Sequence, residues 1–209
     1  GEGPEGGRGE AGVLTVQGSI LLHAGRSAEA RAVYERLCVL APLEPAVWIN
    51  AGYVAKALGH LGEAVAAYRS AVAIDRRSGT GWMGLANLKV SEFHDDDIVE
   101  MREALDEGDA PGPERAQLLF ALATALDRKG RFAEAFEYYS SANSLHRETF
   151  TYDGGRLGNE LSHMRSRLDR TFFAVRSAWG CQSSDPIFIV GMTRSGSTLV
   201  EQILATHPG

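Results

Sequence analysis

Long apolar runs and cysteines are both scarce in this sequence. No continuous apolar run, including the strongly apolar Ile187 to Val190, approaches the roughly 18 to 20 residues that a membrane-spanning helix needs. The two cysteines, Cys38 and Cys181, lie far apart and show no CxxC spacing, which argues against a zinc site and a disulfide framework. The sequence therefore predicts no membrane span and favours a cytoplasmic protein with reduced thiols.

Positive charge and metal-ligand patterns are also lacking. The formal net charge is −6 and the basic residues are scattered, so no nucleic-acid partner is expected. The six histidines show no ligand spacing, and the acidic run Asp95 to Asp97 is better interpreted as the cap of a helix than as a metal site. No metal is predicted.

The two ends of the sequence have distinct compositions. The first ten residues include five glycines and several charges, which predicts a disordered segment over 1–10. The sequence begins with Gly1 rather than Met and stops at Gly209. We therefore expect the chain to be a fragment of a longer protein.

A repeat of 34 residues dominates the middle of the chain. Small and aromatic residues recur at this offset in the pairs Gly18 and Gly52, Ala30 and Ala64, Tyr34 and Tyr68, and Trp48 and Trp82. Small residues at these places allow two antiparallel helices to approach closely, and aromatic residues fill the space between them. The pattern resembles the tetratricopeptide repeat, which implies a solenoid of helical hairpins.

About four such repeats are expected over residues 11–147. The third has Ile98 and Arg102 where the second has Ala64 and Tyr68, so its second helix is degenerate; the fourth is shifted by three residues in the turn from Gly108 to Pro113. Residues 148–180 are predicted to form a capping helix over the end of the stack, because apolar residues from Leu157 to Trp179 recur at spacings of three and four. A linker follows at 181–185.

The character of the sequence changes at Pro186. Ile187 to Val190 is typical of a buried parallel strand, Gly191 to Thr198 is a glycine- and serine-rich loop, and helical spacing resumes at Leu199. A strand, loop and helix in this order aim backbone N–H groups at one point, which is suited to binding phosphate. Compared with the GxxxxGK[ST] form of nucleotide triphosphatases, Ser197 stands in the lysine position and Arg194 supplies a cation from inside the loop.

The segment from Ile187 to Pro208, IFIVGMTRSGSTLVEQILATHP, resembles the 5′-phosphosulfate loop of sulfotransferases, particularly the tyrosylprotein sulfotransferase and bacterial repeat-containing branches. The resemblance implies that Arg194 contacts the phosphosulfate of 3′-phosphoadenosine 5′-phosphosulfate (PAPS) and stabilises charge on the bridging oxygen. It also implies a binding site for the 5′-phosphate at Ser195, Gly196, Ser197 and Thr198. The family's catalytic base and 3′-phosphate segment would lie beyond residue 209, so the chain alone is expected to be inactive.

The sequence thus predicts a mainly α protein: a tetratricopeptide-repeat solenoid followed, over 186–209, by the first β-strand, P-loop and helix of an α/β sulfotransferase domain. The intact protein would transfer a sulfuryl group from PAPS to an acceptor hydroxyl, with protein tyrosine a first hypothesis. A non-catalytic repeat scaffold and a P-loop kinase or triphosphatase are the alternatives. A protein or peptide partner is expected in the concave groove of the repeats, lined by Ile49, Tyr53, Met83, Asn87, Phe120 and Thr124.

Overall fold

The computed structural model describes residues 4–90, 92–108, 110–149, 151, 153–179, 183, 187–192 and 195–207. It divides into two compact units, a repeat unit (Gly1–Thr151) and a C-terminal unit (Tyr152–Gly209). The repeat unit contains α1 Pro4–His23, α2 Ser27–Leu40, α3 Pro45–Ala57, α4 Leu61–Ile74, α5 Gly79–Ala86, α6 Asp95–Asp106, α7 Gly112–Arg128 and α8 Phe132–Glu148. In the described residues, no helix is both long enough and apolar enough to cross a membrane.

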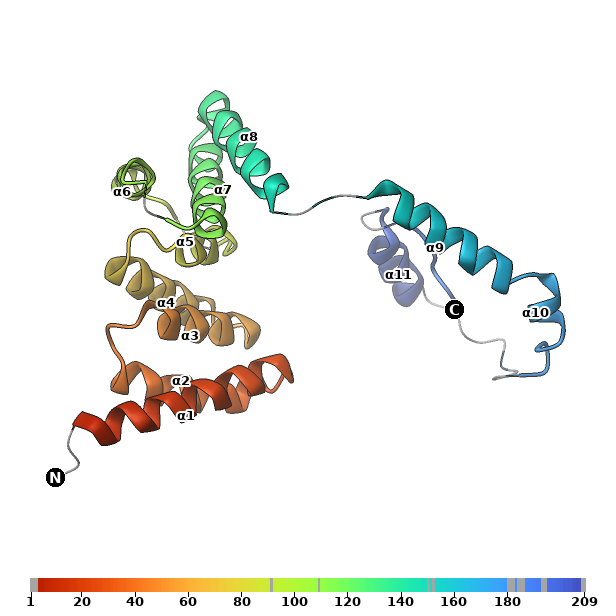
Figure 1. The fold of residues 1–209 in the computed structure, drawn as a ribbon, viewed down its shortest axis with the longest axis horizontal. Coiled ribbons are helices and arrows are strands. Elements are labelled where there is room, and N and C mark those ends of the chain that lie inside the picture. The colour runs from red at the N-terminus through yellow and green to blue at the C-terminus, as the bar shows by residue number, and fades with distance from the viewer. Residues whose placement is uncertain are drawn as a thin grey trace. The chain divides into compact units, whose positions relative to one another are not determined.

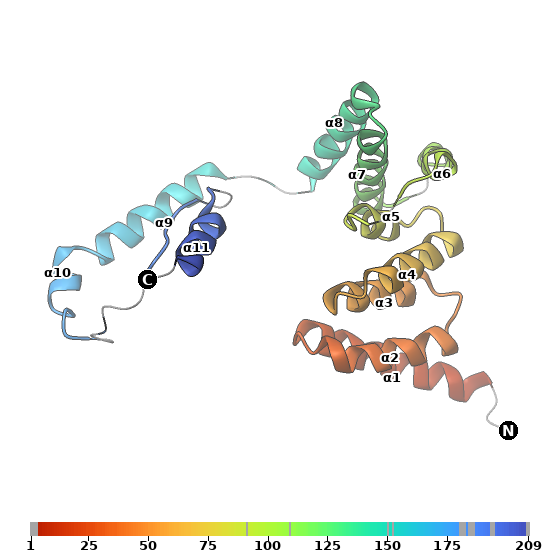
Figure 2. The same ribbon diagram turned by 180° about the vertical axis from the view of Figure 1, so that it is seen from behind.

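The repeat unit is built from antiparallel helical hairpins, as the 34-residue period predicts. α1 pairs with α2, α3 with α4, and α7 with α8, and successive hairpins stack side by side (Figures 1 and 2). The turn inside the second hairpin contains Gly59 at φ +80° and that of the fourth contains Gly130 at φ +75°. Glycine adopts this left-handed conformation without the steric cost of a Cβ atom, so each helix can end sharply.

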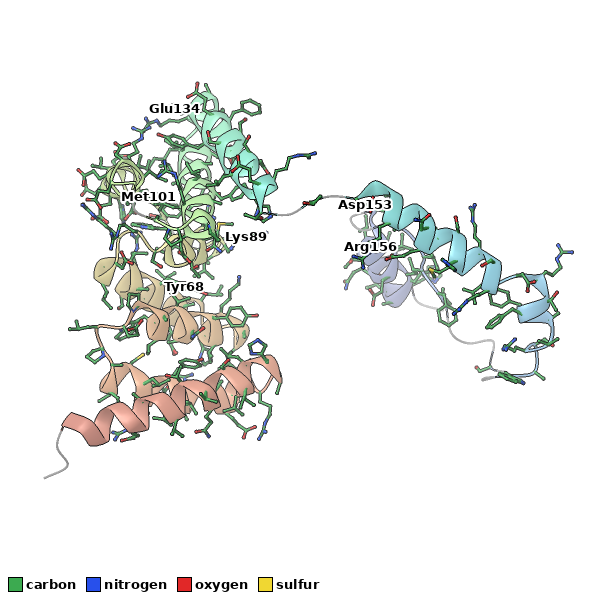
Figure 3. All side chains as sticks on the ribbon, in the orientation of Figure 1. Tyr68, Lys89, Met101, Glu134, Asp153 and Arg156 are labelled. Atoms are coloured by element: carbon green, nitrogen blue, oxygen red, sulfur yellow. The ribbon has the colours of Figure 1, made fainter. Side chains whose placement is uncertain are left out.

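The repeated glycines and tyrosines meet inside the hairpins. A Cβ atom on Gly18 would lie 2.9 Å from the ring of Tyr34, and one on Gly52 would lie 2.8 Å from the ring of Tyr68. Tyr68, labelled in Figure 3, is buried, and burial raises the pKa of its hydroxyl to about 12. The spacing of glycine and tyrosine in the sequence therefore reflects direct contact between the two helices of a hairpin.

The third repeat departs from this scheme, although its second helix forms. α5 has only eight residues and packs against α4 and α7, whereas α6 packs against α7. One guanidinium nitrogen of Arg128 donates to the carbonyl oxygen of Ala86 at 2.7 Å, which satisfies a backbone acceptor at the end of α5. Ile98 and Met101 of α6 are buried in the core, so the degenerate sequence still builds an amphipathic helix.

A ladder of ion pairs joins the second helices of neighbouring repeats. Glu63, Asp97 and Glu134 occupy the same place in successive repeats, near the start of α4, α6 and α8, and each pairs with an arginine of the preceding second helix. The pairs are Arg31–Glu63 at 3.1 Å, Arg69–Asp97 with two contacts, and Arg102–Glu134 at 2.7 Å; Glu134 is labelled in Figure 3. The middle pair is the most buried of the three.

Replacing Asp97 by alanine is expected to lower the free energy of unfolding by about 2 kcal/mol, measured by chemical denaturation. Asp97 is nearly buried, pairs with Arg69 and accepts the backbone N–H of His94 at 2.7 Å, so its loss leaves both groups without that partner. Glu63→Ala is the matched control, because Glu63 holds the same position but is exposed, and its loss should cost at most about 0.5 kcal/mol. Equal effects of the two substitutions would contradict this account.

The N-terminal segment differs from its sequence-based prediction. Residues 1–10 were expected to be disordered, but α1 begins at Pro4, so residues 4–10 are helical and that part of the prediction is wrong. Proline is well tolerated at the first position of a helix, and the carboxylate of Glu10 accepts a hydrogen bond from Arg36 of α2 at 3.0 Å. This contact ties the segment to α2, although one exposed ion pair is too weak to offset the low helix propensity of the glycines by itself.

The C-terminal unit contains α9 Gly154–Arg167, α10 Arg170–Ala174 and α11 Ser197–Thr206. The single helix predicted from Leu157 to Trp179 is wrong, because α9 ends at Arg167 and α10 starts anew. The carboxylate of Asp169 accepts a hydrogen bond from the N–H of Phe172 at 2.7 Å and so caps the start of α10. The expected covering of the repeat stack by residues 148–180 stays a prediction. Of the expected linker, only Ser183 lies within the described residues.

The strand expected at Ile187 to Val190 is not confirmed. These residues have no regular secondary structure, and Phe188 and Val190 are among the most exposed apolar side chains described. A β-strand forms only when a neighbouring strand accepts and donates its hydrogen bonds, and the described residues include no such neighbour. Within the described part of the chain, the segment therefore has the composition of a strand but no sheet to join.

Candidate functional site

The candidate phosphate-binding loop runs from Gly191 into the start of α11. Gly191, Met192 and Ser195 to Thr198 are described, whereas Thr193 and Arg194 lie outside the described residues. The structure therefore shows how the loop enters its helix. It does not place the arginine that the resemblance makes the main cation.

Two glycines shape the described part of the loop. Gly196 has φ +89° and is the residue immediately before the first turn of α11. The N–H of Ser195 donates to the carbonyl of Met192 at 3.0 Å, so the chain folds back on itself here. A Cβ atom on Gly191 would lie 2.5 Å from the hydroxyl oxygen of Ser195. Gly196 is thus favoured by its backbone angle, whereas a side chain at position 191 would require only that the Ser195 hydroxyl rotate away.

The beginning of α11 presents hydrogen-bond donors. The N–H groups of Ser197, Thr198 and Leu199 belong to the first turn, where an α-helix has no acceptor of its own to offer. Gly196 has no side chain with which to cap them, and the first turn contains no acidic residue. Ser195 and Thr198 are exposed and Ser197 is half-buried. The helix dipole and these donors together favour an anion at this end of α11.

The second predicted site, the concave groove of the repeats, is only partly exposed. Tyr53 and Asn87 are exposed, and Ile49, Met83 and Phe120 pack against the core of the repeat unit. The hydroxyl of Thr124 donates to the carbonyl of Phe120 at 2.8 Å and lies 3.2 Å from the hydroxyl of Tyr139. The structure therefore assigns several of the expected groove residues to packing.

One polar hollow was missed by sequence reasoning. A cavity of about 500 Å³ lies among α6, α7 and α8, and its lining includes Arg102, Arg115, Tyr138 and Ser141. A second hollow, of about 360 Å³, lies two repeat interfaces earlier, among α2, α3 and α4, and its lining includes Arg31 and Ser70. Arg31 and Arg102 are both members of the ion-pair ladder, but the 34-residue register aligns Arg31 with Val65 and Arg102 with Tyr68, so the repeat position of these arginines carried no signal for the hollows.

Comparison with known proteins agrees with this division of the chain. Sequence models of the tetratricopeptide repeat match residues 45–78, which contain α3 and α4, and residues 100–144, which run from α6 into α8. A model described as the sulfotransferase family matches residues 186–209, the segment that contains the candidate loop and α11. The chain thus contains tetratricopeptide-type repeats, and its residues 186–209 are similar to the sulfotransferase family.

A relative extends almost along the entire chain. An uncharacterized protein of Aquifex aeolicus (strain VF5) is 28% identical over 196 residues, which are 92% of this chain and 25% of that protein. The chain thus spans about a quarter of the length of this curated relative.

Proposed function

We propose that this chain is part of a sulfotransferase that uses PAPS, with the tetratricopeptide repeats as an N-terminal arm. The observation that carries the proposal is the match of residues 186–209 to the sulfotransferase family, at the place where a glycine turn leads into a helix with open N–H donors. The match covers the loop and the following helix together, so it rests on more than a glycine-rich turn.

PAPS supplies the sulfuryl group, and the residues of this chain would hold the end of the molecule from which that group departs. The N–H and hydroxyl groups of Ser197 and Thr198 would donate to the 5′-phosphate at the positive end of α11. The guanidinium of Arg194 would stabilise negative charge as it develops on the bridging oxygen. Sulfuryl transfer, like phosphoryl transfer, depends on such positioned donors and cations.

Two residues depart from the pattern of the resembled family: Thr193 stands in place of a proline and Ser197 in place of a threonine. The second change keeps the hydroxyl, so a donor and acceptor remains available at that position. The first change removes a conformational restraint and should weaken preorganisation of the loop. We therefore expect the departures to reduce affinity without changing the class of ligand.

The triphosphatase reading is less well supported. Its loop requires a lysine for the β- and γ-phosphates, and Ser197 occupies that position. The non-catalytic scaffold leaves the sulfotransferase match at 186–209 without a role. Tetratricopeptide repeats commonly bind proteins, and we propose that the arm recruits a protein acceptor, with a tyrosine hydroxyl as the hypothesis to test.

The proposal is tested by calorimetric binding of 3′-phosphoadenosine 5′-phosphate to the full-length protein that contains this chain. Tight binding without a metal is expected, and Arg194→Ala should weaken it by roughly tenfold to a hundredfold, because a hydrogen bond to a charged group is worth about 1.5–3 kcal/mol. Arg167→Ala, an exposed arginine of α9, is the matched control and should leave binding unchanged.

The binding results distinguish a sulfotransferase from a kinase or triphosphatase and from a non-catalytic scaffold. ATP with Mg²⁺ serves as the comparator, since triphosphate transfer depends on a metal and sulfuryl transfer does not. Preference for ATP with Mg²⁺ would overturn the sulfotransferase in favour of a kinase or triphosphatase. Absence of binding to either nucleotide would favour the scaffold.

A further inference from the structure

The hollow among α2, α3 and α4 lies between two successive repeats and is lined mainly by apolar and aromatic groups. Trp48, Ala51 and Val54 of α3 line it, together with Tyr34 and Cys38 of α2. We call this space the α3 hollow. Its volume of about 360 Å³ is within the range of roughly 300–1,000 Å³ that is typical of binding sites for small organic molecules.

The next repeat interface fills the corresponding space with its own side chains. At an offset of 34 residues, Ala51 corresponds to Leu85 and Ala67 to Met101. Leu85 and Met101 are both 0% exposed and belong to the main core cluster. In the α3 hollow the two alanines leave this volume unfilled, and the side chain of Trp48 is only half-buried. The space is therefore suited to an apolar group about as large as the side chains it lacks.

The charged side chains that line the α3 hollow carry a net negative charge. Glu35 and Glu63 are exposed carboxylates, and Arg31 is the basic residue of the lining. Arg31 pairs with Glu35 at 2.7 Å and with Glu63 at 3.1 Å, so one guanidinium balances only one of the two carboxylates. Burial, and then the charge of Glu35, raise the pKa of the Cys38 thiol, so this negative charge acts inside the hollow. A cationic ligand is therefore favoured over an anionic one.

The hydrogen-bond donors of the lining already have partners. The indole N–H of Trp48 and the hydroxyl of Ser70 each donate to a backbone carbonyl, at 2.9 and 3.1 Å. The guanidinium nitrogen of Arg31 that does not contact a carboxylate lies 2.7 Å from Nδ1 of His60. An anionic ligand would have to break one of these contacts to use its donor. A cation needs acceptors instead, and carboxylates can accept several hydrogen bonds each.

We propose that the α3 hollow binds a small organic amine, a molecule with an aliphatic or aromatic body and one ammonium group. The body would occupy the space beside Ala51 and Ala67 and contact the ring of Trp48. The ammonium would lie near Glu35 and Glu63, where it balances the second carboxylate and forms charge-assisted hydrogen bonds. Proximity to the indole would add a cation–π attraction. This site is separate from the candidate loop and does not depend on the sulfotransferase proposal.

Saturation-transfer NMR on the full-length protein that contains this chain tests the charge preference. The probes are 2-phenylethylamine and 3-phenylpropanoate, which share an aromatic body and differ in the sign of their charge. We expect the amine to bind about tenfold more tightly than the carboxylate. Glu35→Gln with Glu63→Gln should weaken amine binding about threefold to tenfold and remove the preference. Glu29→Gln is the matched control, because Glu29 is an exposed, arginine-paired carboxylate of α2 outside the lining.

Filling the hollow locates the binding site. Ala51→Leu with Ala67→Met supplies the side chains found one interface later, and it should abolish amine binding without lowering the midpoint of thermal unfolding. Ala57→Met, at an exposed alanine of α3 outside the lining, is the control and should leave binding unchanged. If the double variant is destabilised, Ala51→Leu alone makes the same test at a half-buried position.

Four results would overturn the proposal. They are absence of amine binding, equal binding of the two probes, amine binding that survives the filled hollow, and binding of a lysine-rich peptide in place of the free amine. The last result would assign the cation to a protein partner. Amine binding that is lost in the filled variant and weakened by the two glutamines would support the proposal.

Discussion

Trp82→Ala is expected to lower the free energy of unfolding of the repeat unit by roughly 3–5 kcal/mol. Trp82 lies on α5 and is fully buried in the main core cluster. Its indole N–H also donates to the carbonyl of Arg76 at 2.9 Å. The substitution would remove a large apolar side chain, leave a cavity where three repeats meet, and take away the partner of a backbone carbonyl.

Trp48→Ala provides the matched comparison, because Trp48 occupies the same position one repeat earlier. Its indole N–H donates to the carbonyl of Pro42 at 2.9 Å, but its side chain is only half-buried. We expect a loss of about 1–2 kcal/mol by the same denaturant titration, since less apolar surface is removed from contact. If both variants lost the same free energy of unfolding, burial would not determine how much the tryptophan at this repeat position stabilises the protein.

Gly79→Ala is expected to destabilise the repeat unit by about 3 kcal/mol or more. A Cβ atom at this position would lie 2.0 Å from the carbonyl oxygen of Glu114 and 2.9 Å from the backbone nitrogen of Leu118. Both neighbours are backbone atoms of α7, so relief requires two helices to move apart. The approach is further held by Thr80, whose N–H and hydroxyl donate to the carboxylate of Glu114 at 2.9 and 2.7 Å.

Gly62→Ala is the control for this prediction. Gly62 lies in the first turn of α4, and a Cβ atom there would meet no atom within 4 Å. Alanine has the higher helix propensity, so the substitution should stabilise the protein by up to about 1 kcal/mol. Thermal unfolding of the two variants should therefore shift in opposite directions. Destabilisation of similar size in both would contradict the close approach of α5 and α7.

The hairpins of the repeat unit could be predicted from the sequence because their determinants are local and recur. The contact between Gly18 and Tyr34, for example, appears again between Gly52 and Tyr68, and one register accounts for both. The helix at residues 4–10 was missed because its glycines argue against a helix when read alone. The contact of Glu10 with Arg36 becomes visible only when α1 and α2 are packed together.

Sequence analysis predicted the part of the candidate site that follows from the order of loop and helix along the chain. The order of a glycine-rich loop followed by an amphipathic helix indicated open N–H donors, and α11 begins at Ser197 within the predicted segment. The left-handed conformation of Gly196 supplies the reason for a glycine there. The strand before the loop was not predictable in this way, because its hydrogen bonds must come from other strands.

The sequence by itself determined the repeat period, the hairpin partners and the place where the chain changes to a sulfotransferase-like segment. These features follow from side-chain size at fixed spacings, which acts over a few tens of residues. Only the tertiary structure decided that α5 is short, that Asp97 is the most buried acid of the ladder, and that Val13 and Ile20 are exposed while Val47 and Val54, at an offset of 34 residues, are buried. These outcomes depend on which helix lies beside each residue, and that is settled by packing between repeats.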